Sequence, residues 1–482
     1  MCKEATIKKV KKLYSTGLGY LLMVFIVSMF LPLPASGEDQ GRYSGGKPFV
    51  IKVVDADTGR GIPMVKLETV NHLIQYTDSM GVVAFHEPGF MGKKVFFHVS
   101  SHGYEFKQDG FAFRGKALQV AAGEEVTLEM KRLNIAERLY RITGEGIYSD
   151  SVKAGLEVPT KNPVLNSGVL GSDSVFAAIY LDRIFWLWGD TNQAAYPLGN
   201  YQVSAATSLL PEKGGLDPDV GINLEYFSNG KGFTKKMAPF PGKGPTWLGA
   251  LTTLKDKEGK EHLVAHYVKV KPPMTVYESG LCVYNPDKEV FEISAKFPKD
   301  QKLIPHGHSY GHSNRYTTGG KDYIYFGNPF PLIRIPATFE AWSDPNQYEE
   351  VKPKYDFIDP ETNKPLKTHA GSMAWNPYLK KWIAIFTQMG GTASALGEIW
   401  FATADAPEGP WNYAVKILTH DHYTFYNPCH HPFLNKEGGK VIYFEGTYTK
   451  LFSSNPVATP RYDYNQIMYK LDLSDPRLQG GD

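Results

Sequence analysis

Short apolar stretches separated by turn-forming residues dominate the chain from about residue 46 onward. In the first ninety or so of these residues, each stretch is four to seven residues long and is bounded by Gly, Asp or Ser. Regularly spaced short strands of this kind are typical of a β-sandwich. We therefore predict a sandwich over 46–135 and a linker over 136–159. The expected strands are 51–54, 64–69, 82–85, 94–99 and 126–130.

A second pattern recurs five times after residue 160. Each copy runs from a polar turn through an apolar strand, turns at Gly, Asp or Asn, and returns through a strongly apolar strand. A lone hairpin cannot bury both faces, whereas four-stranded blades stacked around an axis bury them against their neighbours. The chain is therefore expected to be all-β, with a five-bladed β-propeller over 160–475 after the sandwich; the alternative is a pair of unrelated sandwiches. The copies are 171–190, 246–267, 308–328, 370–388 and 426–446.

The amino-terminal residues 1–37 have the layout of a secretory signal peptide. Five lysines precede an apolar run over 18–33, and the small residues Ala35, Ser36 and Gly37 follow it. We expect cleavage near Gly37 and a protein that is secreted, periplasmic or at the cell surface. The alternative is an uncleaved membrane anchor.

The balance of charge changes once this segment is set aside. The full chain has 52 basic and 50 acidic residues, and the chain without 1–37 has 47 and 49. Near-neutrality gives no electrostatic basis for binding nucleic acid or a membrane surface. We therefore expect no nucleic-acid partner and no stable membrane insertion after cleavage. Only Cys282 and Cys429 then remain, as one disulfide or as two buried thiols.

Candidate chemistry lies where the repeated hairpins begin and end, because those positions converge on the axis of a propeller. Asp173 begins the first hairpin and Asp190 ends it. Neighbouring antiparallel strands lie about 5 Å apart, so the two carboxylates can face one cavity. Glycoside hydrolysis needs such a pair, one protonated and one ionised. The alternative is that both are turn residues that accept hydrogen bonds from backbone amides.

Two further carboxylates interrupt apolar strands. Glu398 and Glu445 each stand in an apolar setting, where a carboxylate must be paired, hydrogen-bonded or protonated. Either is a candidate third catalytic carboxylate. The alternative is structural pairing with Arg315 or Arg461.

Aromatic, imidazole and amide side chains near the hairpin ends are candidates for binding substrate. Alternation along a strand places His306, His308 and His312 on one face, and imidazole is a common metal ligand. No carboxylate or cysteine completes a metal-binding spacing with them, so no cofactor is implied; a structural metal ion in the pocket is the alternative. The candidate substrate-binding residues are Trp188, Trp247, His266, His308, Tyr310, His312, Asn328, His369, Gln388, His430 and His431.

Two stretches resemble known families. The segment "DADTGRGIPMVKL" with "YTDSMGVVAF" resembles the prealbumin-like or carboxypeptidase-regulatory-like sandwich, which is usually an accessory module. The segments "GSDSVF", "FWLWGDTN", "AGSMAWNPYLKKWIAIFT", "GEIWFATADAPEGPW" and "YNPCHHPFLNKEGGKVIYFEGTY" resemble the five-bladed propellers of glycoside hydrolase family 43. They are more similar to secreted propellers that include the endo-D-arabinanases of family 183.

The resemblance implies that Asp173 and Asp190 match the acidic pair of those enzymes. The run "HGHSYGHSNRY" has no counterpart in it. The leading hypothesis is therefore an exported glycosidase-like propeller acting on a furanose- or uronate-containing polysaccharide or oligosaccharide. The alternatives are a non-catalytic glycan-binding propeller at the cell surface and a His-assisted, metal-dependent lyase or hydrolase.

Overall fold

The computed structural model describes residues 46–298 and 311–479, and its elements are almost all strands. The predicted signal peptide lies outside the described residues. Within the two described ranges, no helix is long and apolar enough to cross a bilayer. The helices are α1 (Ser149–Lys153) and α2 (Phe339–Ser343), with 3-10 turns at Pro211–Lys213, Pro345–Gln347, Pro432–Leu434, Glu437–Gly439 and Pro476–Leu478.

The first group of strands is a β-sandwich of two four-stranded sheets, ordered β4-β1-β8-β6 and β3-β2-β5-β7. Ile51 and Val53 of one sheet share an apolar core with Phe97 and Val99 of the other. β1 and β8 are parallel, and the remaining pairs are antiparallel. The strands are β1 (Phe49–Asp55), β2 (Lys66–Thr69), β3 (Ile74–Tyr76), β4 (Val82–Phe85), β5 (Lys94–Ser100), β6 (Tyr104–Glu105), β7 (Gly115–Gln119) and β8 (Glu125–Arg132).

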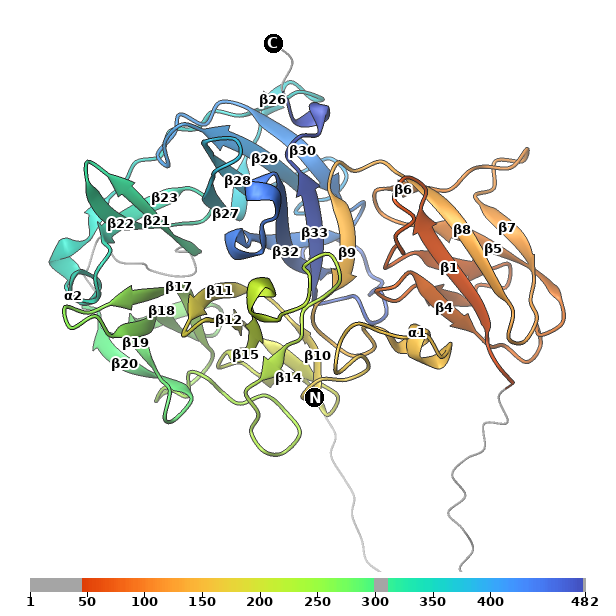
Figure 1. Cartoon of the computed structure of the whole chain (residues 1–482), viewed down its shortest axis with the longest axis horizontal. Coiled ribbons are helices and arrows are strands. Elements are labelled where there is room, and N and C mark those ends of the chain that lie inside the picture. The colour runs from red at the N-terminus through yellow and green to blue at the C-terminus, as the bar shows by residue number, and fades with distance from the viewer. Residues whose placement is uncertain (1–45, 299–310, 480–482) are drawn as a thin grey trace, which may run out of the picture. The chain divides into compact units, whose positions relative to one another are not determined.

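The second group forms five four-stranded sheets around a common centre, the blades of a propeller (Figure 1). Blade 1 is β11 (Phe176–Tyr180), β12 (Arg183–Trp188), β15 (Ser204–Leu209) and β16 (Glu225–Tyr226). Blade 2 is β17 (Thr246–Lys255), β18 (Glu261–Lys271), β19 (Thr275–Asn285) and β20 (Val290–Lys296). Blade 3 is β21 (His312–Thr318), β22 (Lys321–Gly327), β23 (Pro331–Pro336) and β24 (Glu349–Glu350).

The last two blades are built in the same way. Blade 4 is β27 (Thr368–Asn376), β28 (Lys381–Gln388), β29 (Glu398–Ala404) and β30 (Ala414–Thr419). Blade 5 is β31 (Thr424–His430), β32 (Val441–Thr449), β33 (Asn465–Asp472) and β9 (Glu137–Arg141). Two small sheets stand outside the blades: β10 (Val169–Ser172), β13 (Thr191–Gln193) and β14 (Tyr196–Asn200), and β25 (Ile358–Asp359) with β26 (Lys364–Pro365).

Each of the five hairpins predicted from the repeat supplies the two inner strands of one blade. The inner strands follow one another in space as β11, β17, β21, β27 and β31. Tyr426 and Asn427 of β31 then bond to Asp173 and Ser174, which precede β11, so blade 5 meets blade 1. The predicted all-β fold, a sandwich followed by a five-bladed propeller, is confirmed, and the alternative of two unrelated sandwiches is wrong.

Strand β9 differs from the sequence prediction, which placed a linker over 136–159. It pairs with β33 as the outermost strand of blade 5, so a segment before the repeats completes the last blade. All five of its residues are buried, including Glu137, Arg138 and Arg141. A strand covered on both faces shows no alternation of apolar and polar residues. Because β9 also contains three charged residues, its sequence does not read as an apolar run, and the strand was not predicted.

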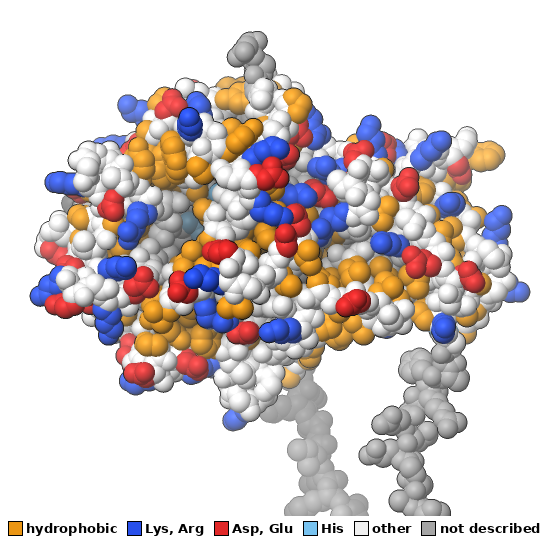
Figure 2. All heavy atoms as spheres, in the orientation of Figure 1, with side chains coloured by type: hydrophobic (Ala, Val, Ile, Leu, Met, Phe, Trp, Pro, Cys, Tyr) orange, Lys and Arg blue, Asp and Glu red, His pale blue; other side chains and the backbone are white. Residues whose placement is uncertain are grey.

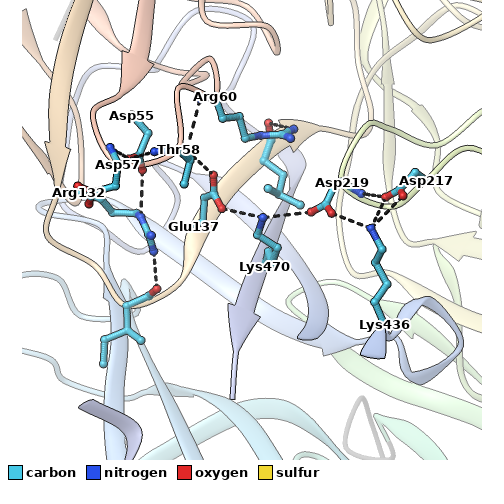
Figure 3. Close-up of polar contacts among 12 residues, drawn as sticks. Asp55, Asp57, Thr58, Arg60, Arg132, Glu137, Asp217, Asp219, Lys436 and Lys470 are labelled. Carbon is cyan, nitrogen blue, oxygen red and sulfur yellow. Dashed lines mark hydrogen bonds and ion pairs between the residues drawn. The ribbon is translucent and has the colours of Figure 1, made fainter. Parts of the chain in front are cut away.

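A row of charged contacts holds β9 in place (Figure 3). Lys470 Nζ lies 2.9 Å from Glu137 Oε2 and 3.2 Å from Asp219 Oδ1. Lys436 Nζ lies 2.8 Å from Asp219 Oδ2. Burial raises the pKa of Asp219, but the hydrogen bonds and charges of Lys436 and Lys470 outweigh it and lower that pKa overall. From the sandwich, Thr58 Oγ1 donates to Glu137 Oε1 at 3.4 Å. The closing strand is thus tied both to the sandwich and to blade 1.

The surface and the cysteines bear on two further expectations. Cys282 and Cys429 are both buried free thiols, so the disulfide alternative is wrong. On the face shown in Figure 2, acidic and basic side chains are interspersed. That distribution matches the balanced charge of the sequence.

Candidate active site

A cavity of about 620 Å³ lies at the centre of the propeller, and residues of all five blades line it. It falls within the range of about 300–1,000 Å³ that is usual for small-molecule sites. Its lining combines two carboxylates with imidazole, amide and phenol groups and several apolar side chains. The polar lining residues are Asp173, Ser174, Asp190, Trp247, His266, Tyr267, His312, Asn328, His369, Tyr426, Asn427 and Tyr464.

Asp173 lies between β10 and β11, at the point where the chain enters the first blade. Tyr426 Oη donates to its Oδ2 at 2.6 Å, and the Asp190 backbone amide donates to its Oδ1 at 2.8 Å. Burial is the largest influence and leaves the pKa of Asp173 above its ordinary value, although hydrogen bonds from Tyr426, the Asp190 amide, Tyr464 and Ser174 oppose that rise. These donors favour the ionised carboxylate.

Asp190 follows β12 and has fewer donors. Trp247 Nε1–H of blade 2 donates to its Oδ1 at 3.2 Å. Burial is the largest cause that raises the pKa of Asp190, the negative charge of Asp173 adds to it, and the value reaches about 6. The two carboxylates are therefore neighbours with different proton affinities, and in such a pair the group with more donors ionises first.

Irregularities in the inner strands direct side chains into the cavity. The pairing register slips between Gly249 and Thr252 in β17, between 368 and 371 in β27, and between 426 and 429 in β31. A bulge inserts an extra residue and re-aims its side chain. His369 and Asn427 lie within two of these irregularities and line the cavity. His266 is on a second strand, but its cross-strand partner is Gly249, which has no side chain to block its way.

The cavity histidines are neutral hydrogen-bonding groups. Burial lowers the pKa of His266 and of His312 to about 3 and lowers that of His369. His312 Nδ1 lies 3.4 Å from the Cys429 sulfur. Burial, together with the charge of Glu445, also raises the pKa of that thiol, so both members of the contact are neutral. These rings can donate to or accept from hydroxyl groups without adding charge.

Of the predicted site residues, Asp173, Asp190, Trp247, His266, His312, Asn328 and His369 line the cavity. His308 and Tyr310 lie outside the described residues.

The two other predicted carboxylates lie elsewhere. Glu398 begins β29, a third strand, and its Oε1 lies 3.2 Å from Lys416 Nζ. Glu445 is in β32, a second strand, and its Oε1 lies 2.8 Å from His431 Nε2. Neither lines the cavity and neither pairs with the predicted arginines. The prediction was wrong for these two residues because it assumed that every polar residue within an apolar strand faces the propeller axis. Side chains of the second and third strands of a blade mostly face the neighbouring blade instead.

The same correction applies to four predicted substrate-binding residues. Trp188 stacks beside Trp186 in the core between blades. Gln388 Oε1 accepts from Trp400 Nε1 at 2.8 Å inside blade 4. His430 and His431 follow the irregularity in β31 that turns Asn427 toward the cavity, and both are buried in blade 5. Their imidazoles contact Asn435 and Glu445.

Several cavity residues were outside the prediction. Tyr464 and Phe452 belong to the connection between β32 and β33, and Met274 to the turn between β18 and β19. None of them is in a repeated hairpin, and the candidate site residues were predicted from the ends of those hairpins. The cluster of Tyr and Asp at 462–464 is a sequence feature that indicates a role for the connection between β32 and β33.

Within 46–298 and 311–479, no group of three or more His, Cys, Asp or Glu side chains is arranged to hold a metal ion.

Comparisons with known proteins give a likeness to solved propeller glycosidases. No family model and no curated protein matches the chain. An exo-1,5-α-L-arabinanase from a bovine ruminal metagenomic library is 11% identical, over 63% of this chain and 94% of its own, with a TM-score of 0.37. The exo-β-1,3-galactanase of Phanerochaete chrysosporium is 10% identical, over 70% and 65%, with a TM-score of 0.38. A family 43 β-xylosidase/α-arabinofuranosidase from a compost metagenome is 12% identical, over 64% and 92%, with a TM-score of 0.35.

Proposed function

We propose that the chain hydrolyses a glycosidic bond of a polysaccharide or oligosaccharide, with Asp190 as general acid and Asp173 as base or nucleophile. The observation that supports this is the pairing of two neighbouring carboxylates with unequal hydrogen bonding on one central cavity. Glycoside hydrolysis requires one carboxylic acid and one carboxylate beside the scissile bond. We also propose that the protein is exported after cleavage near Gly37.

The division of roles follows from the donors. Asp173 is surrounded by groups that stabilise its ionised form, so it can attack or activate water. Asp190, with a pKa of about 6, holds its proton in mildly acidic solution and can pass it to the leaving oxygen. Hydrolysis should therefore decline as pH rises through about 6, because the general acid loses its proton there.

The neutral imidazoles and amides complete the site. His266, His312 and Asn328 present donors and acceptors to sugar hydroxyls from blades 2 and 3. Uncharged partners bind hydroxyls without disturbing the proton balance of the two carboxylates.

The test is a screen of the mature chain on arabinan, xylan, galactan and mannan for new reducing ends. On a substrate that is cleaved, Asp173→Asn and Asp190→Asn should each lower kcat/KM about 10²- to 10⁴-fold. The matched control is Asp182→Asn, an exposed Asp in the turn of the same hairpin that does not line the cavity. Full activity of either cavity variant would overturn the assignment. Binding to a glycan without any cleavage would instead favour the non-catalytic alternative.

A further inference from the structure

The mouth of the cavity carries large apolar side chains that are exposed to solvent. Phe452 is 67% exposed and Met274 is 68% exposed, and both line the cavity. Leu451, beside Phe452, is also exposed and lines it. Large apolar groups that remain exposed at the rim of a cavity need an explanation, because burying them would stabilise the fold.

Phe452 is held in a backbone conformation that disfavours it. Residues Lys450 to Ser453 form a turn in which Ser453 N–H donates to the Lys450 carbonyl at 3.2 Å. The third residue of that turn, Phe452, has φ of +64°. Glycine is favoured at such a position, and a residue with a bulky side chain there is strained.

The turn is fixed on both sides, so the strained residue is presented rigidly. Lys450 N–H donates to Asp463 Oδ1 at 2.6 Å, and Ser453 Oγ donates back to the Lys450 carbonyl at 2.6 Å. Asn455 Nδ2 donates to the His422 carbonyl at 3.1 Å. These bonds fix the backbone but bury little of the Phe452 ring.

A ring contact of Phe452 leads to the carboxylates. Its ring meets Tyr426 at a centroid distance of 6.0 Å and an interplanar angle of 85°. Tyr426 is the residue that donates to Asp173. The exposed aromatic ring is therefore one side chain away from the proposed catalytic pair.

We propose that Phe452 binds a sugar ring of the substrate by stacking at the cavity mouth, in a subsite next to the one where the bond is cleaved. The π face of an aromatic ring is negative and attracts the weakly positive C–H face of a sugar. This inference rests on the proposed function for the identity of the ligand. It assigns the cavity an oligosaccharide of at least two rings and gives Phe452 a role in binding, not in catalysis.

The decisive variant is Phe452→Gly, because glycine relieves the backbone and removes the ring. A structural role for the ring predicts a lower Tm, whereas our inference predicts an unchanged or higher Tm with weaker substrate binding. Phe452→Trp keeps an aromatic ring at this position and should therefore bind the substrate about as well as the wild type does. The matched control is Leu181→Gly: Leu181 is 59% exposed, has φ of +48° in the turn between β11 and β12, and does not line the cavity.

Binding is measured by calorimetry in the Asp190→Asn background, with xylotriose, β-1,3-galactotriose and 1,5-α-arabinotriose as separate probes. We expect Phe452→Gly to raise the Kd of the triose that binds by about tenfold or more, and Leu181→Gly to leave that Kd unchanged. On a cleaved substrate, Phe452→Gly should raise KM with kcat little changed.

The outcomes separate the two proposals. Binding that depends on Phe452 in a protein that hydrolyses nothing would overturn the proposed function and support this inference. Hydrolysis that is lost in Asp190→Asn but has the same KM in Phe452→Gly would support the function and overturn this inference. Failure of all three trioses to bind would also overturn it.

Discussion

The hydrogen bond from Tyr426 to Asp173 should set the acidic limit of the reaction, and Tyr426→Phe tests this. The Oη to Oδ2 distance of 2.6 Å is in the range of charge-assisted hydrogen bonds. A hydrogen bond to a charged group contributes about 1.5–3 kcal/mol, and each pKa unit corresponds to about 1.4 kcal/mol. Loss of this donor should therefore raise the pKa of Asp173 by about one to two units.

The direction of the shift follows from which form the donor stabilises. Tyr426 favours the ionised carboxylate and lowers the pKa of Asp173, so its removal keeps the proton on that group to a higher pH. The base or nucleophile is then lost over part of the acidic range. The acidic limb of the kcat/KM profile should move upward by about one to two units, while the basic limb near 6, set by Asp190, stays close to its place.

The assay is the pH profile of kcat/KM for the wild type, Tyr426→Phe and Tyr148→Phe. Tyr148 Oη donates to the Val220 carbonyl at 3.3 Å, so this control also removes a hydrogen bond of a buried phenol, but outside both the cavity and β9. An acidic limb that does not move in Tyr426→Phe would refute the role given to Asp173. Movement of the basic limb alone would show that the two aspartates have exchanged roles, since coupled carboxylates titrate as a pair.

The two buried carboxylates outside the cavity give further predictions. Lys416→Met should lower the free energy of unfolding by roughly 3 kcal/mol in urea titration, because it leaves the buried Glu398 unpaired, whereas Glu398→Gln should keep kcat at the wild-type value. A fall in kcat for Glu398→Gln comparable to that of Asp190→Asn would contradict its placement outside the site. Burial raises the pKa of Glu445 well above its ordinary value, so the folded state binds the extra proton and stability falls as pH rises above about 4.5. Glu445→Gln should therefore raise Tm relative to the wild type at pH 8 and not at pH 4, as measured by calorimetry; equal Tm values at both pH values would contradict it.

The repeated hairpins could be predicted because burial on both faces leaves a strong mark on sequence. A strand such as β28, "KWIAIFTQ", is buried along almost its whole length and reads as a continuous apolar run between turns. Five such runs, each with a partner strand, indicate five blades. The same reasoning selected Asp173 and Asp190 at the ends of the first hairpin, and both line the central cavity.

Two features of the site could not be predicted from the sequence. One is the strand register, which decides which side chains face the cavity, and the other is the contribution of residues outside the repeated hairpins. The register of β31 shifts between 426 and 429; Asn427, within the shift, lines the cavity, and His430, which follows it, is buried in blade 5. Nothing in the spacing of apolar residues records that shift. Tyr464 and Phe452 come from a connection between strands, and their role depends on how the last blade meets the first, which no local pattern encodes.

Closure of the ring and the chemistry of the site are therefore linked. Asp173 belongs to the start of blade 1, whereas its donor Tyr426 belongs to blade 5, so their hydrogen bond exists only in the closed ring. Blade 5 is completed by β9, which lies more than 320 residues before its partner β33 and is held by the Glu137–Lys470 ion pair. Contacts at the outer edge of the propeller thus keep Tyr426 within reach of Asp173. Because that donor opposes the effect of burial on the pKa of Asp173, the closing strand helps to keep the carboxylates unequal without touching either of them.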